Sequence, residues 1–245
     1  MNELNNIEKR YAAAMLGDMK ALDFNNPELW PLIRESMKRV AYHEAGHFTA
    51  RLFTQLELSH TTEISILGNS ENAGYVRSER NFTESNLESY PPPLIRSNGY
   101  MLLIKNIAGY GAEALLDKSE EWENVFDYYE YNYCGDDYDT EGTDFYKALR
   151  IAGIMSKPFM PVNRIINLAN KWTLEMLKIP IVWNKVEVVA AKLIKQGEIK
   201  KEELDDLLFD EKFPDCYHLP KWRRRIFPKP GELDQYIEKE AEEQE

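Results

Sequence analysis

Apolar residues recur through most of the chain at intervals of three and four positions, which places them on one face of a helix. Capping residues before these stretches, and proline or glycine after several of them, mark where each helix begins and ends. The pattern predicts helices over 5–20, 31–53, 94–116, 143–155, 161–177, 181–196 and 201–208.

One short stretch changes to the alternation that is typical of a strand. Apolar or β-branched residues alternate with polar ones over 62–66, residues 68–72 supply a turn, and 74–76 resume an extended run. The pattern predicts a small β-hairpin after the second helix. We therefore expect a mainly α fold of the α+β class.

The chain is expected to divide into an N-terminal helical extension over 1–30, a main domain over 31–210 and a C-terminal tail over 211–245. Residues 119–142 are acidic and rich in tyrosine, and we interpret them as a loop or insertion beside the functional site. The tail has several prolines and a glutamate-rich end, a composition typical of an extended appendage.

The helix predicted over 31–53 contains a five-residue motif of two histidines with a glutamate, His43-Glu44-Ala45-Gly46-His47. Histidines four residues apart project from the same helix face, so both imidazoles can reach one metal ion. Glu44 would then stand beside the metal, where it can take a proton from a water that the metal activates. The motif predicts the site of a zinc peptidase.

One feature of the motif weighs against a purely structural pair of buried histidines: a buried structural histidine more often stands alone than in a pair with a glutamate between.

Gly46 is unfavourable in a helix interior by about 1 kcal/mol relative to alanine. Its presence indicates that another backbone or a substrate passes close by, although a packing constraint alone would explain it equally well.

From Arg39 to Leu208 the order of elements resembles the peptidase domain of the FtsH family, which are ATP-dependent membrane zinc proteases. Four segments carry the resemblance: 39–47 resembles the metal-binding helix, 63–67 with Gly74-Tyr75 the substrate-edge strand and its turn, 107–115 the glycine-containing second helix, and 143–152 the segment with the third ligand. If 63–67 is an exposed edge, an extended peptide could add to it as a further strand.

The resemblance implies a helical, zincin-like metallopeptidase domain over 31–210, with Zn²⁺ held by His43, His47 and Asp144 and an open fourth position for water. Glu44 would be the general base. Asp144 is assigned as the third ligand through this resemblance. Its expected place in the first turn of a helix capped by Thr143 suits an anionic side chain.

Other residues are alternative ligands. Glu113 could replace Asp144, or it could orient a ligand histidine without contacting the metal. Asp136, Asp137 and Asp139 could bind the metal or calcium, but their spacing does not complete a calcium loop, so a solvated acidic loop is the default. Cys216 and His218 are too few for a second metal site.

The sequence also departs from full-length members of that family. It contains neither a GxxxxGK nucleotide loop nor an apolar run long enough to cross a bilayer. We therefore expect a zinc-dependent endopeptidase that acts on unfolded or flexible polypeptides without its own ATPase motor. The alternative is a non-catalytic or partner-dependent metal- or peptide-binding module. An ATPase or adaptor partner and a homo-oligomer both remain open.

The composition of the chain restricts the kinds of partner and the cellular location that we expect. A net charge of -12 argues against a nucleic-acid backbone as the partner, because phosphate contacts need concentrated lysine and arginine. The chain has two cysteines, too few for a disulfide framework, and its first residues lack the layout of a signal peptide. We expect a cytoplasmic protein with reduced thiols and no membrane contact.

Overall fold

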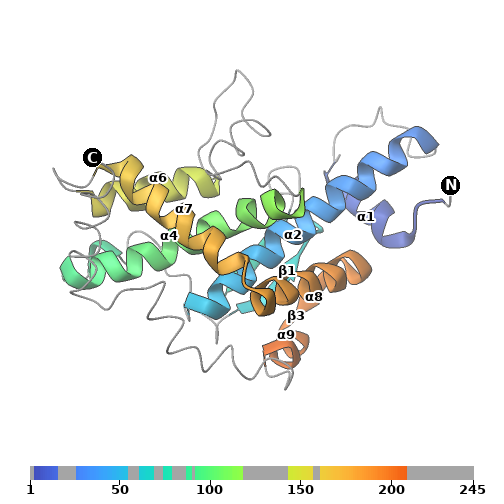
Figure 1. The fold of residues 1–245 in the computed structure, drawn as a ribbon. Coiled ribbons are helices and arrows are strands. Elements are labelled where there is room, and N and C mark those ends of the chain that lie inside the picture. The colour runs from blue at the N-terminus through green and yellow to red at the C-terminus, as the bar shows by residue number, and fades with distance from the viewer. Residues whose placement is uncertain are drawn as a thin grey trace.

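The predicted helices form with small changes at their ends, except that residues 16–20 of the first one lie outside the part of the chain that the structure describes. The computed structural model describes residues 3–15, 26–54, 61–68, 74–78, 87–89, 92–117, 143–156 and 161–208. Its helical elements, shown in Figure 1, are α1 (Asn6–Met15), the short 3-10 helix η1 (Pro27–Leu29), α2 (Trp30–Thr54), α4 (Pro92–Leu116), α6 (Asp144–Met155), α7 (Val162–Leu177), α8 (Pro180–Gln196) and α9 (Lys201–Leu208). The described chain is mainly helical, as the spacing predicts.

Prolines and a glycine mark several helix ends. Pro27 opens η1 and Pro180 opens α8, positions where the missing N–H of proline costs nothing. Helix α4 begins at Pro92, two residues before the predicted start, for the same reason. Gly197 ends α8 with a φ of 82°, a left-handed backbone conformation that favours glycine.

The sheet has three strands where the sequence predicted a hairpin. Strands β1 (Thr61–Ser65) and β2 (Tyr75–Ser78) pair antiparallel as expected, and β3 (Glu198–Lys200) pairs antiparallel with the other side of β1. The strand order is β2-β1-β3. A three-residue strand between two helices is too short to show a period, and the sequence therefore did not predict β3.

This third strand corrects the expectation that 63–67 forms an exposed edge. Ile64 faces Val76 of β2 on one side and Ile199 of β3 on the other, so β1 is the central strand. Its backbone groups are therefore occupied on both sides and cannot take up a further strand there. Among the described strands, the two edges of the sheet belong to β2 and β3.

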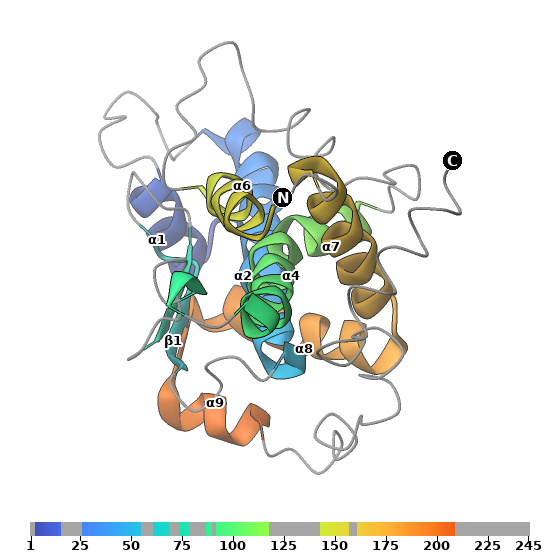
Figure 2. The ribbon, with the colours of Figure 1, turned by 90° about the vertical axis from the view of Figure 1, so that its left-hand side faces the viewer.

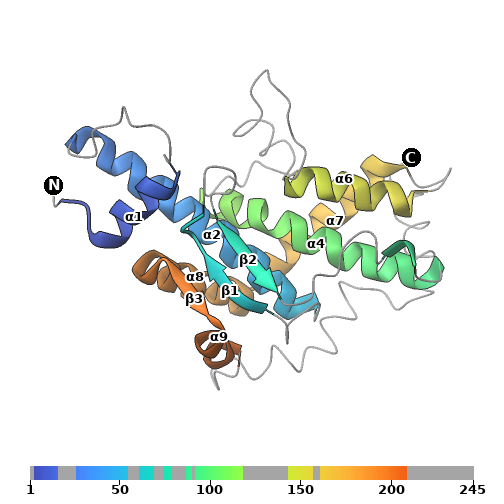
Figure 3. The ribbon, with the colours of Figure 1, turned by 180° about the vertical axis from the view of Figure 1, so that it is seen from behind.

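Helix α2 lies at the centre of the fold. It packs against α4 and α8, while α4 also contacts α6 and α7. Figure 1 views the molecule from the side of α7, and Figure 3 shows the sheet on the opposite side of α2. In Figure 2, α1 and the sheet lie to one side of the α2–α4 pair and α7 to the other. The motif helix is thus covered from several directions.

The N-terminal helix belongs to the same buried cluster as the rest. Tyr11 is 2% exposed, and its hydroxyl lies 2.7 Å from Oγ of Ser36 on α2. Nε of Arg34 donates to Oε1 of Glu8 over 2.8 Å, which ties α1 to α2 a second time. Residues 119–142, with Asp136, Asp137 and Asp139, and the tail with Cys216 and His218 lie outside the described residues.

Within the described part of the chain, no helix is both long enough and apolar enough to cross a bilayer.

Candidate metal centre

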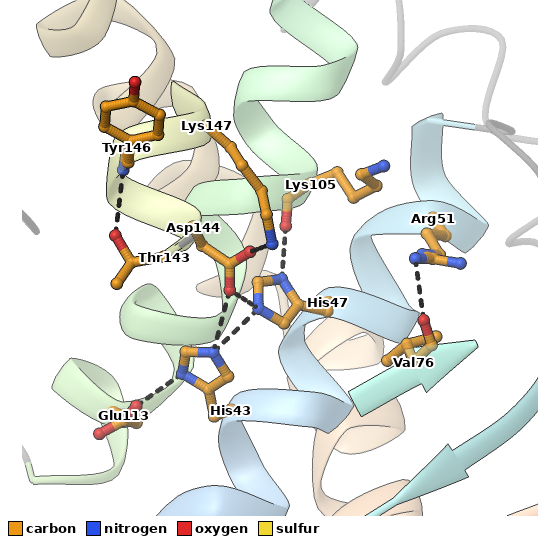
Figure 4. Close-up of polar contacts among 10 residues, drawn as sticks. All are labelled: His43, His47, Arg51, Val76, Lys105, Glu113, Thr143, Asp144, Tyr146 and Lys147. Atoms are coloured by element: carbon orange, nitrogen blue, oxygen red, sulfur yellow. Dashed lines mark hydrogen bonds and ion pairs between the residues drawn. The ribbon is translucent and has the colours of Figure 1, made fainter. Parts of the chain in front are cut away.

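The two motif histidines stand one turn apart on α2 and point the same way (Figure 4). Their Nε2 atoms lie 2.9 Å apart, and the rings meet edge to face with centroids separated by 4.6 Å. His47 is buried and His43 is half-buried. The helical register that the sequence predicted therefore brings both imidazoles to one point.

Asp144 reaches this point from a distant part of the chain. It occupies the first turn of α6, where the side chain of Thr143 caps the helix by accepting from the backbone N–H of Tyr146 at 3.2 Å. Oδ2 of Asp144 lies 2.9 Å from Nε2 of His47 and 3.5 Å from Nε2 of His43. One atom from each of these three residues falls within a span of 4.8 Å, so together they could hold a metal ion.

The outer nitrogens of both imidazoles are already committed. Nδ1 of His47 lies 2.6 Å from the carbonyl oxygen of Lys105, which can only accept, so this nitrogen carries a proton. Nδ1 of His43 lies 2.6 Å from Oε1 of Glu113 and donates to that carboxylate. In the neutral ring each Nε2 is then left with a lone pair that faces the other Nε2 and Asp144. The three atoms can then share a metal ion or a proton between them.

The electrostatics of the three groups point in the same direction. Burial by itself would lower the pKa of His43, but hydrogen bonds to Asp144 and Glu113 and the charges of Glu113 and Glu44 outweigh it and raise the pKa to about 10. Burial would raise the pKa of Asp144, yet the charge of His47 and the hydrogen bonds from both imidazoles hold it well below its usual range. The site attracts positive charge, which a proton or a metal can supply.

Lys147 contacts the other oxygen of the carboxylate. Its Nζ lies 2.9 Å from Oδ1 of Asp144, one turn further along α6 (Figure 4). The sequence pattern did not point to Lys147. The signal that could have found it is its position three residues after Asp144, because helix residues at this spacing are neighbours. Because Lys147 takes Oδ1, Oδ2 is the atom of Asp144 that faces the two histidines.

Glu44 lies on α2 between the two candidate histidine ligands in the sequence, and its pKa is affected by the charges of all three candidate ligands. It is 5% exposed, and burial raises the pKa of its carboxyl group, while the charges of His43 and His47 act to lower it. A Cβ atom added at Gly74 would lie 2.8 Å from its Oε1, so the residue that precedes β2 passes directly against the carboxylate. Glu44 therefore lies between the histidines and the β2 edge of the sheet.

Arg51 fixes that edge to the motif helix. It lies on α2 one turn beyond His47, is 6% exposed, and donates to Oγ of Ser78 and, over 3.4 Å, to the carbonyl oxygen of Val76 (Figure 4). Its charge also acts to lower the pKa of Glu44. The sequence did not single it out, though a charged residue on the predicted apolar face is a detectable signal.

The structure distinguishes between the two carboxylates that the sequence offered as a third ligand. Asp144 faces the Nε2 atoms of both histidines, whereas Glu113 contacts Nδ1 of His43 on the far side of the ring. Glu113 is 2% exposed and occupies the place of a carboxylate that orients a ligand histidine, the second role considered for it.

No protein-family model matches this chain, and no curated protein matches it either.

Proposed function

We propose that the chain is a zinc-dependent endopeptidase that hydrolyses peptide bonds in unfolded or flexible polypeptides. One observation carries the proposal: two imidazole nitrogens on one helix turn and a carboxylate 97 positions away converge with their electron pairs directed at one another. The motif on α2 includes a buried glutamate next to this cluster, which a purely structural metal site does not need.

Zinc suits this set of donors, because it is commonly bound by two histidines and a carboxylate in catalytic sites. When bound, zinc would supply a Lewis acid that polarises a carbonyl group and makes water acidic near neutral pH. His43, His47 and Asp144 would hold it. Glu113 and the Lys105 carbonyl would keep the imidazoles in the tautomer that presents Nε2.

Glu44 has the chemistry of the general base. It would accept a proton from the attacking water and return it to the amine that leaves when the peptide bond breaks. Burial raises the pKa of Glu44, which brings a carboxylate closer to the neutral range in which such a group can both take and release a proton. The carboxylates of Glu113 and Asp144 contact the imidazoles, so among the described carboxylates beside the histidines it is Glu44 that is available for this role.

The sheet offers a place for an extended peptide next to Glu44. Because β1 is paired on both sides, the edge that borders the site is β2, whose preceding residue Gly74 lies against Glu44. An extended polypeptide that adds to β2 as a further strand would place its backbone beside the Glu44 carboxylate. This favours flexible chains over folded proteins as substrates.

The resemblance of 39–208 to FtsH-family peptidase domains supports the same reaction, and it adds an ATPase or adaptor partner as part of the proposal. We also propose the cytoplasm as the location, since two cysteines in 245 residues suit a reducing compartment.

The proposal is tested by measuring zinc content and the cleavage of casein, an unstructured substrate. Wild type is compared with Glu44→Gln. The amide keeps the size of the side chain but cannot take the proton. We expect one zinc per chain in both proteins and a loss of cleavage of about 10²–10⁴-fold in the variant. Glu35→Gln is the matched control, because Glu35 lies on the same helix with its side chain exposed.

Three results would contradict this proposal. A folded wild-type protein that was never exposed to chelator and contains no zinc would remove the metal centre. A zinc-loaded wild type that leaves casein intact, or equal cleavage by Glu44→Gln, would favour the non-catalytic or partner-dependent module instead.

A further inference from the structure

Helix α4 faces the candidate metal centre with residues spaced four apart. The carbonyl oxygen of Lys105 accepts from His47, and the carboxylate of Glu113 accepts from His43, eight positions later. Residues at this spacing share one helix face. Gly109 stands midway between the two, so it is the residue of α4 that lies opposite the Nε2 atoms.

The surroundings of Gly109 consist of the two imidazoles. A Cβ atom added there would lie 2.6 Å from Nε2 of His43, 2.6 Å from Nε2 of His47 and 2.6 Å from Cε1 of His43. Zinc binds imidazole nitrogen at about 2.0–2.1 Å. A carbon atom that contacts both Nε2 atoms would therefore occupy part of the space that a shared zinc ion needs.

Helix stability does not explain a glycine at this position. Gly109 is buried in the interior of α4, where alanine would be more favourable for the helix. Ordinary helix packing does not explain it either. Atoms of α4 are nearest to the Cβ position of Gly46, and flexible side chains of α7 are nearest to that of Gly111, whereas the three atoms nearest to Gly109 all belong to the histidines.

We propose that Gly109 is a positioning residue for the metal. Because glycine has no side chain, the α4 backbone can contact the ring edges of His43 and His47 and still leave room for the ion between them. This inference rests on the proposed metal centre. It adds a requirement on α4 to a site whose ligands come from α2 and α6.

Gly109→Ala tests the role, with Gly153→Ala as the matched control. Both glycines lie within helices, but an added Cβ at Gly153 meets nothing within 4 Å. We measure zinc content, zinc affinity by chelator competition, the visible spectrum of the Co²⁺-substituted protein, and helix content. Gly153→Ala should match wild type in each. Gly109→Ala should keep its helix content, bind zinc at least 100-fold more weakly and lose the Co²⁺ spectrum.

The outcomes separate this inference from the proposed function. Zinc affinity of Gly109→Ala within threefold of wild type would overturn the role of Gly109 alone. A wild type without zinc would overturn both proposals. Weak zinc binding by Gly109→Ala, together with a zinc-loaded wild type that cleaves no casein, would support Gly109 while removing the peptidase.

A second variant covers the case in which Gly109→Ala does not fold. If the added methyl group clashes with the imidazoles, both of them must be shortened to make room, because both Nε2 atoms lie 2.6 Å from the added Cβ, so the triple variant His43→Ala/His47→Ala/Gly109→Ala should recover helix content. A triple variant that stays unfolded, while His43→Ala/His47→Ala folds, would show that the clash lies elsewhere and would overturn the inference.

Discussion

At the scale of single residues, each candidate ligand histidine is oriented by a hydrogen bond from its other ring nitrogen. Glu113 accepts from His43 and the Lys105 carbonyl accepts from His47, both over 2.6 Å. Asp144 is the group that faces both Nε2 atoms. Asp144 is therefore placed to act as a ligand in the proposed metal centre, whereas Glu113 is placed to support His43.

The difference predicts unequal losses of metal. Asp144→Ala removes a ligand and should abolish stoichiometric zinc, whereas Glu113→Gln should weaken zinc binding by about 10–100-fold, as changes to supporting groups do. Zinc per chain and chelator competition measure both. Equal loss in the two variants, or retention of zinc by Asp144→Ala, would mean that the third ligand is assigned wrongly.

At the scale of elements, the site depends on the close approach of α2 and α4. A Cβ atom added at Gly46 would overlap the carbonyl oxygen of Ala108 and lie 2.9 Å from Cβ of Ala112. The glycine of the motif thus meets the backbone of another helix, one of the two explanations that its presence suggested. This approach places the α4 groups within reach of the imidazoles.

Gly46→Ala should therefore destabilise the protein even though alanine favours a helix. The obstacle is a backbone oxygen that cannot rotate away, and overpacking of this kind costs about 1–3 kcal/mol. Chemical denaturation should show this loss in the free energy of unfolding, and the melting temperature should fall by about 2–4 °C per kcal/mol. Gly153→Ala should be neutral or stabilising, and a Gly46→Ala protein as stable as wild type would contradict the close contact.

At the scale of the whole molecule, the site links α2, α4 and α6 through charge. His43 lies between Glu113 of α4 and Asp144 of α6, and these partners raise its pKa to about 10. In the protein stripped of metal, a proton on His43 takes part in holding the three helices together. Folding stability and protonation of this ring are therefore linked.

The linkage predicts how the chelator-treated protein responds to pH. The pKa of His43 rises from 6.5 to about 10 on folding, so its contribution to stability is complete below pH 6.5 and is lost as pH rises towards 10. The melting temperature of the metal-free protein should fall across this window, more steeply than that of His43→Gln. Parallel curves for the two proteins would show that the ring carries no such proton.

The sequence by itself determined what depends on local spacing. Helical periodicity predicted most of the helices, alternation predicted β1 and β2, and the motif placed His43, Glu44 and His47 on one helix. These are consequences of the 3.6- and two-residue periods, which need no knowledge of distant contacts. Asp144 entered only through a family resemblance, since nothing local marks it as a partner of residues about a hundred positions earlier.

Only the tertiary structure decided the contacts between distant segments. Pairing with β3 made β1 a central strand, and the packing of α4 on α2 assigned the Lys105 carbonyl, Gly109 and Glu113 to the candidate metal centre. A sequence shows that residue 109 is a glycine, but it shows neither what a backbone carbonyl contacts nor what the missing side chain makes room for. Their roles arise from the distance between two helices, which is set by packing across the whole core rather than by local spacing.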